Sequence, residues 1–335
     1  MQKKYSYYFL LASFAILLFG CKPGKKKEFP VDIPKDSIIS VNIYRYDSIL
    51  MSIDVNNLKS EIKRYKPDYM LFLDTDLNDT LNLVKLYNYI SDPVLHEIYD
   101  DVNKTYPNLN NLKKQLSDAF TLFKYHFPDK TVPKVYTYLS FLDYENKIIY
   151  LDTVMAIAID MYLGKDYKMY QSVRIPKYLS SRLDSNYIVP DAMKSIAESI
   201  LNFQITGKTL LDIMVYRGKI LFFLDSVLPE VADNIKIGYT PQQLEWCIKN
   251  EDKIWAFLIE NNLLYNNDFY KIRPLITEAP STKGFTNSAP RMTDWIGWQI
   301  IKQFHSNNKN ISLSNLLKEN DAQKILELSR YKPKK

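Results

Sequence analysis

The sequence predicts a helix-rich α+β fold with a small sheet in its N-terminal half and helices through its C-terminal half. Helical patterns occupy the chain up to about Phe127, and short runs rich in β-branched and aromatic residues follow between Pro133 and Asp152. From Pro190 onward the pattern is again mostly helical. Strands and helices that are segregated along the chain, rather than alternating, are typical of α+β domains.

The start of the chain has the pattern of a lipoprotein signal peptide, which we place at residues 1–20. Lys3 and Lys4 precede a mostly apolar run at residues 5–19, and the motif Leu-Phe-Gly-Cys ends at Cys21. The apolar run is shorter than the roughly 20 residues that cross a bilayer. The motif has the form of a bacterial lipobox, in which Cys21 is lipidated and becomes the first mature residue. The alternative is an uncleaved membrane anchor with an incidental cysteine.

Residues 21–36 are predicted to form a flexible basic tether. This segment contains the lysines Lys22, Lys25, Lys26 and Lys27. We expect these lysines to lie near anionic lipid headgroups. Beyond the tether, basic residues are interspersed with acidic ones, so the formal net charge of +6 does not indicate nucleic acid binding.

Glycine is too scarce for the common nucleotide sites. The chain has 8 glycines in 335 residues and contains neither Gly-x-Gly-x-x-Gly nor Gly-x-x-x-x-Gly-Lys. Such loops need glycine where backbone N–H groups approach a phosphate. Gly-x-Ser-x-Gly is also absent, which argues against an α/β-hydrolase nucleophile. We therefore expect no nucleotide and no bound cofactor.

The expected elements follow from the hydrophobic pattern in chain order. We predict a strand or two at residues 37–51, helices at 81–90, 93–106 and 111–127, and two strands at 134–142 and 146–152 joined by a turn at 143–146. The apolar run at 153–164 extends the sheet or begins a helix, and residues 277–294 form a loop.

This order suggests two lobes. We expect an N-terminal lobe with the sheet at residues 37–205 and an all-helical C-terminal lobe at residues 206–335, with a helix at 190–204 along their boundary.

The histidines offer little support for a metal site. The chain has three, His96, His126 and His305. His96 and Asp100 lie four residues apart beside Glu97, which superficially resembles a zinc-binding helix. On a helical wheel these three polar residues fall opposite the apolar side, so a solvated face explains them.

An aspartate cluster has part of a calcium-loop pattern. Asp74, Asp76 and Asn78 have the required spacing, but Asp79 replaces the turn glycine and Lys85 replaces the final glutamate. This departure from the pattern argues against calcium binding.

Two further features are best interpreted as core residues. Cys247 lies in an apolar helical pattern with no histidine near it in sequence, so we predict a buried, inert thiol. Trp295 and Trp298 are three residues apart and are expected to form a buried aromatic pair, the alternative being a contact surface.

The predicted helix at 190–204 carries one polar residue of interest, Glu198. Lys194 precedes it by four residues, which predicts a weak ion pair on an exposed face. The apolar face of the helix is formed by Ala192, Met193, Ile196, Ala197, Ile200, Leu201 and Phe203.

Several long stretches resemble the gliding-motility lipoprotein GldB family. They are YPNLNNLKKQLSDAFTLFKYHFPDKTVPKVYTYLSF, AIAIDMYLGKDYKMY, IPKYL, KTLLDIMVYRGKILFFLDSVLP, IGYTPQQLEWCIKNEDKIWAFLIENNLLY and DWIGWQII. The resemblance spans residues 39–304, and the lipobox stands where that family carries it.

GldB-like proteins are in turn similar to HExxH zinc metalloproteases with a zincin-like, two-lobed α+β fold. On that resemblance, Ala197 stands in place of the first histidine and Leu201 in place of the second. Glu198 keeps the place of the general base, and Arg217 stands where such proteases carry a glutamate ligand.

The replaced residues imply a degenerate site with no metal. Without imidazole ligands there is no Zn²⁺ to lower the pKa of a bound water from about 15.7 toward 7. We expect Arg217 to place a positive charge near the former metal position and to pair with Glu198. We also expect the face that carries Glu198 to line a cleft between the lobes.

These features together predict a lipid-anchored, non-catalytic pseudo-metalloprotease scaffold of the gliding-motility envelope machinery. The resemblance implies envelope proteins of the gliding or type IX secretion machinery as partners, and a chain anchored to a membrane and facing the periplasm. The alternative function is a zinc-dependent peptidase with non-standard ligands such as His96 or His126. A third possibility is a structural envelope protein without a cleft-bound ligand.

Overall fold

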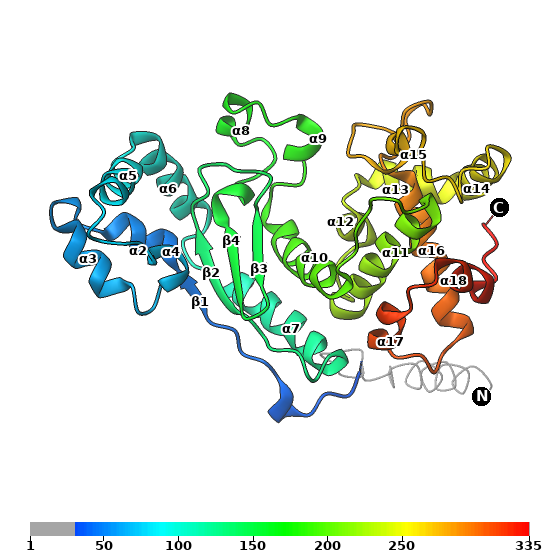
Figure 1. Cartoon of the computed structure of the whole chain (residues 1–335), viewed down its shortest axis with the longest axis horizontal. Helices are drawn as coiled ribbons and strands as arrows, with labels where there is room; N and C mark the ends of the chain where they lie inside the picture. The colour runs from blue at the N-terminus through cyan, green and yellow to red at the C-terminus, as the bar shows by residue number, and fades with distance from the viewer. Residues whose placement is uncertain (1–30, 335) are drawn as a thin grey trace, which may run out of the picture. The chain divides into compact units, whose positions relative to one another are not determined.

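The computed structural model describes residues 31–334 and divides the chain into two units, residues 1–34 and residues 35–335. All elements discussed below belong to the second unit (Figure 1). The predicted signal peptide, Cys21 and most of the tether lie outside the described residues.

A four-stranded mixed sheet lies in the N-terminal half, as the sequence predicted. Its strands are β1 (Ile43–Arg45), β2 (Lys134–Tyr138), β3 (Ile148–Leu151) and β4 (Val154–Ala158), in the order β1-β2-β4-β3. β2 is parallel to β1 and β4, whereas β3 is antiparallel to β4, with Ile149 opposite Ala156. β2 and β4 are the two inner strands, each with a neighbour on both sides, and β4 is the more buried of the two.

A short helix precedes β1, and further helices lie between β1 and β2 in the chain. They are η2 (Lys35–Ser37), α2 (Tyr46–Ser52), η3 (Val55–Asn57), α3 (Leu58–Tyr65), α4 (Met70–Leu73), α5 (Thr80–Ile90), α6 (Pro93–Thr105) and α7 (Asn110–His126). The N-terminal positions are marked by local capping. Asp92 accepts a hydrogen bond from the Val94 N–H, and Pro93 occupies the first turn of α6, where its missing N–H leaves no bond unmade.

Short helices connect β4 to the long helix α10. They are η4 (Ile159–Tyr162), α8 (Lys168–Ser172), α9 (Lys177–Ser180), η5 (Ser185–Tyr187) and α10 itself (Ile188–Leu201). α10 packs against β3 and α7 and ends at Asn202, which adopts the left-handed conformation that closes many helices.

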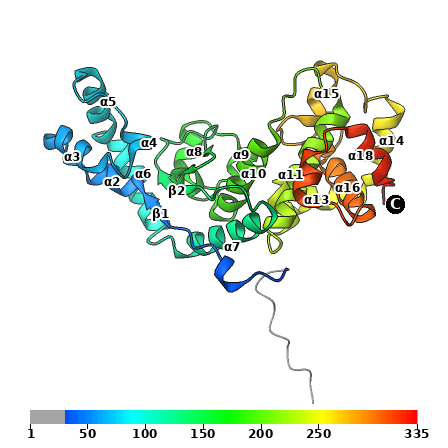
Figure 2. The same ribbon diagram turned by 60° about the horizontal axis from the view of Figure 1, so that its bottom comes forward.

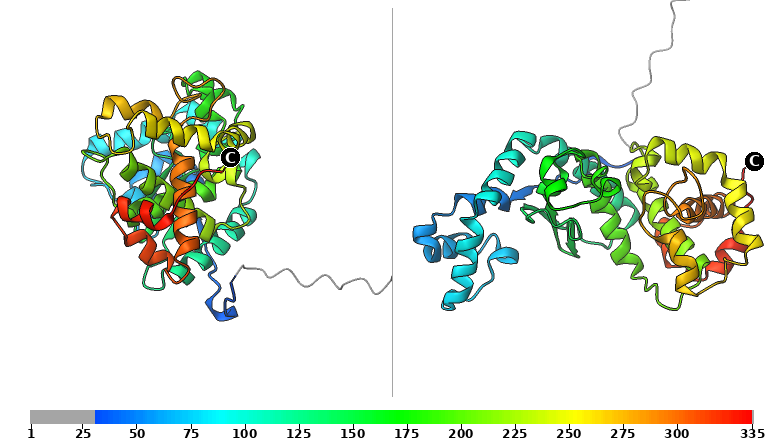
Figure 3. Two further views of the ribbon diagram at one scale, coloured as in Figure 1. Left: turned by 90° about the vertical axis from the view of Figure 1, so that its right-hand side faces the viewer. Right: turned by 90° about the horizontal axis from the view of Figure 1, so that it is seen from above.

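The C-terminal half is entirely helical within the described residues. Its helices are α11 (Leu210–Val227), α12 (Asp233–Ile237), α13 (Pro241–Lys249), α14 (Glu251–Glu260), α15 (Phe269–Ile276), α16 (Met292–Asn307), α17 (Leu313–Lys318) and α18 (Ala322–Ser329). α11 and α16 are the most buried of them, and α16 lies among the others, as the view from above shows (orange in Figure 3). Its tryptophans Trp295 and Trp298 are buried, with ring centroids 5.8 Å apart, which confirms the predicted aromatic pair.

Two glycines allow α11 and α16 to cross with their backbones in contact. A methyl group added at Gly297 would lie 2.0 Å from the Met214 carbonyl oxygen, and one added at Gly218 would lie 2.3 Å from the Gly297 carbonyl oxygen. Both distances are far below van der Waals contact, so only glycine fits at this crossing. The crossing therefore sets how closely the two central helices of this half approach.

One expectation for the N-terminal half, the arrangement of the strands at 134–152, needs correction. The predicted strand at residues 37–51 is present as the three-residue β1, after which the chain turns into α2 at Tyr46, whose ring stacks on Phe72 with 4.1 Å between centroids. The strands β2 and β3 exist, but β4 lies between them, so the turn near Asp143 does not join paired neighbours. The run at 153–164 supplies both β4 and η4, so it extends the sheet and then begins a short helix.

Substitution of Gly297 by alanine tests the helix crossing. Helix propensity alone would favour the alanine by about 1 kcal/mol. The clash with the Met214 carbonyl should instead lower the free energy of unfolding by about 3 kcal/mol, measured by chemical denaturation. Ser199→Ala, on the exposed face of α10, is the control and should change stability by less than about 0.5 kcal/mol. A Gly297→Ala protein as stable as the parent would contradict the crossing.

Candidate functional site

A cleft of about 320 Å³ lies beside α10, and Glu198 contributes to its wall. Residues of β3, α10 and α12 line it, together with the segment before η5 and the loop before α16. The expectation that Glu198 faces a cleft is thus confirmed. Its side chain is 45% exposed, and its carboxylate lies 3.9 Å from the ammonium of Lys194, the i,i+4 partner predicted from the sequence.

An ion pair and a phenol form one end of the cleft. Lys147 Nζ lies 2.5 Å from Asp191 Oδ2, and the Tyr162 hydroxyl donates to the same oxygen over 2.9 Å. Burial alone would raise the pKa of Asp191, but the charge and hydrogen bond of Lys147, together with Lys194 and the Tyr162 hydroxyl, outweigh it and lower that pKa. This carboxylate is therefore charged at neutral pH and joins α10 to the sheet.

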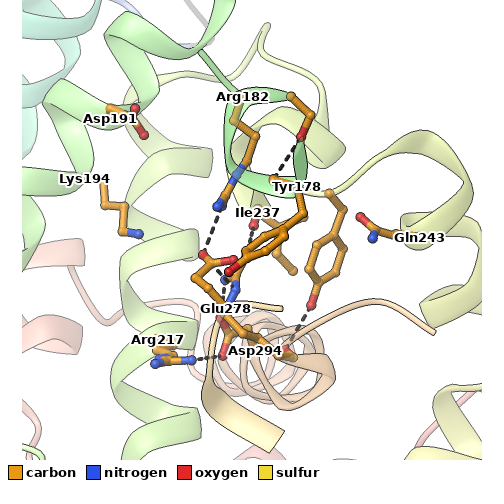
Figure 4. A network of polar contacts seen from close by, with 12 residues as sticks. Tyr178, Arg182, Asp191, Lys194, Arg217, Ile237, Gln243, Glu278 and Asp294 are labelled. Atoms are coloured by element: carbon orange, nitrogen blue, oxygen red, sulfur yellow. Dashed lines mark hydrogen bonds and ion pairs between the residues drawn. The ribbon is translucent and has the colours of Figure 1, made fainter. Parts of the chain in front are cut away.

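Glu278 is the centre of the other end of the cleft. One of its oxygens, Oε1, accepts from Arg182 over 3.0 Å and lies 3.1 Å from Arg291 Nε. Burial would raise the pKa of Glu278, but the guanidinium groups of Arg291 and Arg182 lower it to about 2. Figure 4 shows Glu278 between Arg182 and the pairs formed by Asp294.

Asp294 links this cluster to the helix crossing. Its two oxygens take one arginine each, Arg217 over 2.9 Å and Arg291 over 2.6 Å. Arg217 also donates to the Ile276 carbonyl, and Arg291 to the Ile237 carbonyl. Three arginines therefore share the two carboxylates of Glu278 and Asp294, in surroundings where Arg291 is only 7% exposed.

Gly238 makes room for this arrangement. It has a φ of +74° at the end of α12, and a side chain there would lie 2.8 Å from the Arg182 guanidinium. A residue other than glycine would therefore be strained and would displace Arg182. The Arg182–Glu278 pair also forms the wall that this cleft shares with a second cavity of about 520 Å³, lined by Tyr178, Gln243 and Pro280 among others.

The predicted pairing of Arg217 with Glu198 is wrong. Arg217 is engaged by Asp294 of α16 and by the Ile276 carbonyl, whereas Glu198 faces Lys194. The reason is the glycine crossing, which brings Arg217, beside Gly218, against α16. The two residues still share a neighbourhood. The pKa of Tyr216 is raised to about 12 by burial and by the charge of Glu198, while Arg217 acts in the opposite direction.

The side chains at the positions that the metalloprotease resemblance would assign to metal ligands do not fit a zinc ion. Ala197 is fully buried and offers a methyl group, and Leu201 is half-buried and offers an isobutyl group. The guanidinium of Arg217 is a cation held by Asp294. Among the residues that the structure describes, no three His, Cys, Asp or Glu side chains are grouped closely enough to hold a metal. The carboxylate of Glu198 cannot by itself supply the full set of protein ligands that a zinc site requires.

The other candidates from the sequence have structural explanations. His96 Nε2 contacts the Ile90 carbonyl oxygen at 2.9 Å. In the aspartate cluster, Asp74 pairs with Lys66 over 2.8 Å, and Asp79 caps α5 through the Leu81 N–H. Cys247 is fully buried, and burial raises the pKa of its thiol to about 12, which confirms the predicted inert residue.

No sequence pattern identified Arg182, Glu278 or Arg291 as functional residues. All three lie in or beside loops, outside any periodic pattern, and Glu278 is 96 residues from its partner Arg182. Only the two prolines, two serines and one glycine of residues 277–294 marked this stretch as a loop. A loop that is stabilised by ion pairs to distant segments cannot be identified from local pattern.

Comparison with known families gives a match over most of the chain. The family described as "Gliding motility protein GldB" matches residues 26–333. No curated protein and no solved structure matches the chain. Of the helices that the structure describes, none combines the length and the apolar character needed to cross a bilayer.

A double-mutant cycle tests the partner of Arg217. Arg217→Met and Asp294→Asn should each destabilise the protein, and their combination should show a coupling of about 1–3 kcal/mol in chemical denaturation. The same cycle with Glu198→Gln should give no coupling, because Glu198 faces Lys194. Additive effects in the first cycle would refute the Arg217–Asp294 pair.

Glu278 should make the stability depend on pH. Its folded pKa of about 2 lies below its ordinary value of 4.5, so its contribution is present above pH 4.5 and is lost as pH falls toward 2. Glu278→Gln should cost about 1–2 kcal/mol at pH 7, after allowance for the third of the side chain that is exposed, and progressively less toward pH 2. Unfolding in urea between pH 2 and 7 measures this. Glu145→Gln, an exposed change in the same cleft, is the control. If Glu278→Gln lowered the free energy of unfolding by the same amount at every pH, the prediction would be contradicted.

Proposed function

The chain belongs to the family of the gliding motility protein GldB, and from this membership we propose that it is a lipid-anchored, non-catalytic scaffold of the gliding-motility envelope machinery. In this proposal Cys21 is the lipid attachment point, and the basic tether connects it to the folded part. The folded part faces the periplasm and binds an envelope protein of the gliding or type IX secretion machinery.

The donor set at the degenerate positions supports the non-catalytic part of the proposal. A zinc hydrolase needs ligands that hold the ion and lower the pKa of its water. Here an alanine, a leucine and an arginine stand at the three positions, and the arginine has two protein partners of its own. The observation that carries this part is the Arg217–Asp294 pair, because it uses Arg217 as a structural link between α11 and α16.

The charges of the cleft support binding of a partner segment. The lining of the cleft contains five basic side chains and four carboxylates, so it has one positive charge in excess. One of these basic residues is Lys194, whose half-exposed ammonium lies 3.9 Å from the equally exposed carboxylate of Glu198. A partner segment with a carboxylate would gain charge-assisted hydrogen bonds here, which are stronger than neutral ones.

Site-specific photo-cross-linking in cells tests the scaffold. A photoreactive residue at Ser195, which lines the cleft, should give one discrete cross-linked species with an envelope protein. The matched control is Ser199, one turn farther along α10 on an exposed position outside the cleft lining. No product at Ser195, or equal products at both positions, would contradict partner binding in the cleft.

Metal content and Glu198 test the catalytic alternative in the same protein. The purified chain should contain zinc well below one equivalent by elemental analysis, and Glu198→Gln should leave gliding unaffected. Stoichiometric zinc, together with peptidase activity that a chelator removes and Glu198→Gln abolishes, would replace the scaffold by a peptidase.

A further inference from the structure

Helix α5 has apolar residues on two faces, although only one face is covered. Leu83, Leu86 and Ile90 pack into the local core formed with α2, α3 and α4. On the other face, Leu81, Val84 and Tyr87 are 59%, 46% and 46% exposed. A helix of a soluble protein usually presents polar residues to water, so an outward apolar stripe of this kind indicates a surface that binds something.

A groove of about 630 Å³ runs between this stripe and helix α3. α5 contributes Leu83, Val84 and Tyr87 to the groove, α3 contributes Leu58, Lys59, Ser60 and Lys63, and η3 adds its three residues. Val84 and Tyr87 on α5, and Lys59 and Lys63 on α3, are each about one helical turn apart, so both helices turn a face to the groove. A groove between two helix faces has the shape that receives a third helix.

The charge of the groove has one sign. Its described lining includes Lys59 and Lys63 and no carboxylate. Lys59 donates to the neutral amide of Asn78 over 3.3 Å, and in the described chain neither lysine forms an ion pair. An occupant with an apolar stripe and acidic residues beside it would match both the apolar side chains and the lysines of the groove.

We propose that this groove binds an amphipathic helix of a partner protein, with the apolar face of that helix on Val84 and Tyr87 and its acidic residues against Lys59 and Lys63. A membrane surface fits less well, because the adjoining pocket carries Asp74 and Asp76 beside the same lysines. An anionic bilayer would be repelled by these carboxylates, whereas one helix in the groove need not contact them.

The proposal goes beyond the cleft and does not depend on it. The groove is formed by residues of α3 and α5, and in space these helices lie on the side of the fold away from the C-terminal helices (Figures 1 and 2). The cleft lies beside α10. A helix bound at α3 and α5 would leave the cleft accessible. The two sites can therefore be tested separately.

The test uses the full mature chain and two synthetic helical peptides with the same leucine stripe. One peptide carries glutamates beside the stripe, and the other carries lysines at the same positions. Fluorescence anisotropy should show at least tenfold tighter binding of the glutamate peptide. Lys59→Glu with Lys63→Glu should reverse that preference, and Val84→Glu should weaken binding at least tenfold.

Val94→Glu is the matched control, because Val94 is 44% exposed, lies outside the groove lining and has nearly the same exposure as Val84. It should leave binding within twofold, and melting curves should show all variants folded. Equal affinity for both peptides, or no reversal by the lysine substitutions, would overturn the proposal. Two other outcomes would also overturn it: self-association in sedimentation that Val84→Glu abolishes, and binding to phosphatidylglycerol vesicles that depends on the two lysines. Neither result bears on the cleft.

Discussion

The contact between Gly218 and Gly297 is the constraint on which the C-terminal half depends. Two helix backbones can approach this closely only where neither carries a side chain at the crossing. Arg217 precedes one glycine, and Asp294 lies one turn before the other, so the crossing also brings this ion pair together. A packing requirement between two glycines therefore determines an electrostatic contact at the edge of the cleft.

From that contact, a chain of ion pairs extends across the cleft. Asp294 holds Arg291, Arg291 lies against Glu278, and Glu278 accepts from Arg182, which belongs to the segment between α9 and η5. Each charge is partly or wholly removed from water, so each must be compensated by its neighbour. The network joins the loop before α16 to the segment that leads into α10, and it leaves the arginines in slight excess over the carboxylates.

The cleft and the α3–α5 groove differ in how they would recognise a partner. The cleft is lined by charged and polar groups that are mostly paired within the protein, so a ligand must exchange with existing hydrogen bonds or use the half-exposed Lys194. The groove combines exposed apolar side chains with two lysines that have no carboxylate beside them in its described lining. Binding there requires less rearrangement, because burial of apolar surface supplies the free energy and the lysines set orientation.

Local pattern was sufficient for the long helices of both halves, the existence of the sheet, the buried Cys247 and the Trp295–Trp298 pair, because periodicity and apolar content act over a few neighbouring residues. It also placed Glu198 beside Lys194. Strand order, the pairing of Arg217 with Asp294 and the position of Glu278 between two arginines came only with the folded chain. These contacts join residues 77 and 96 positions apart, and their partners are chosen by helix crossing and by the cost of burying an unpaired charge. Neither the helix crossing nor the cost of burying an unpaired charge produces a pattern in the spacing of residues along the chain.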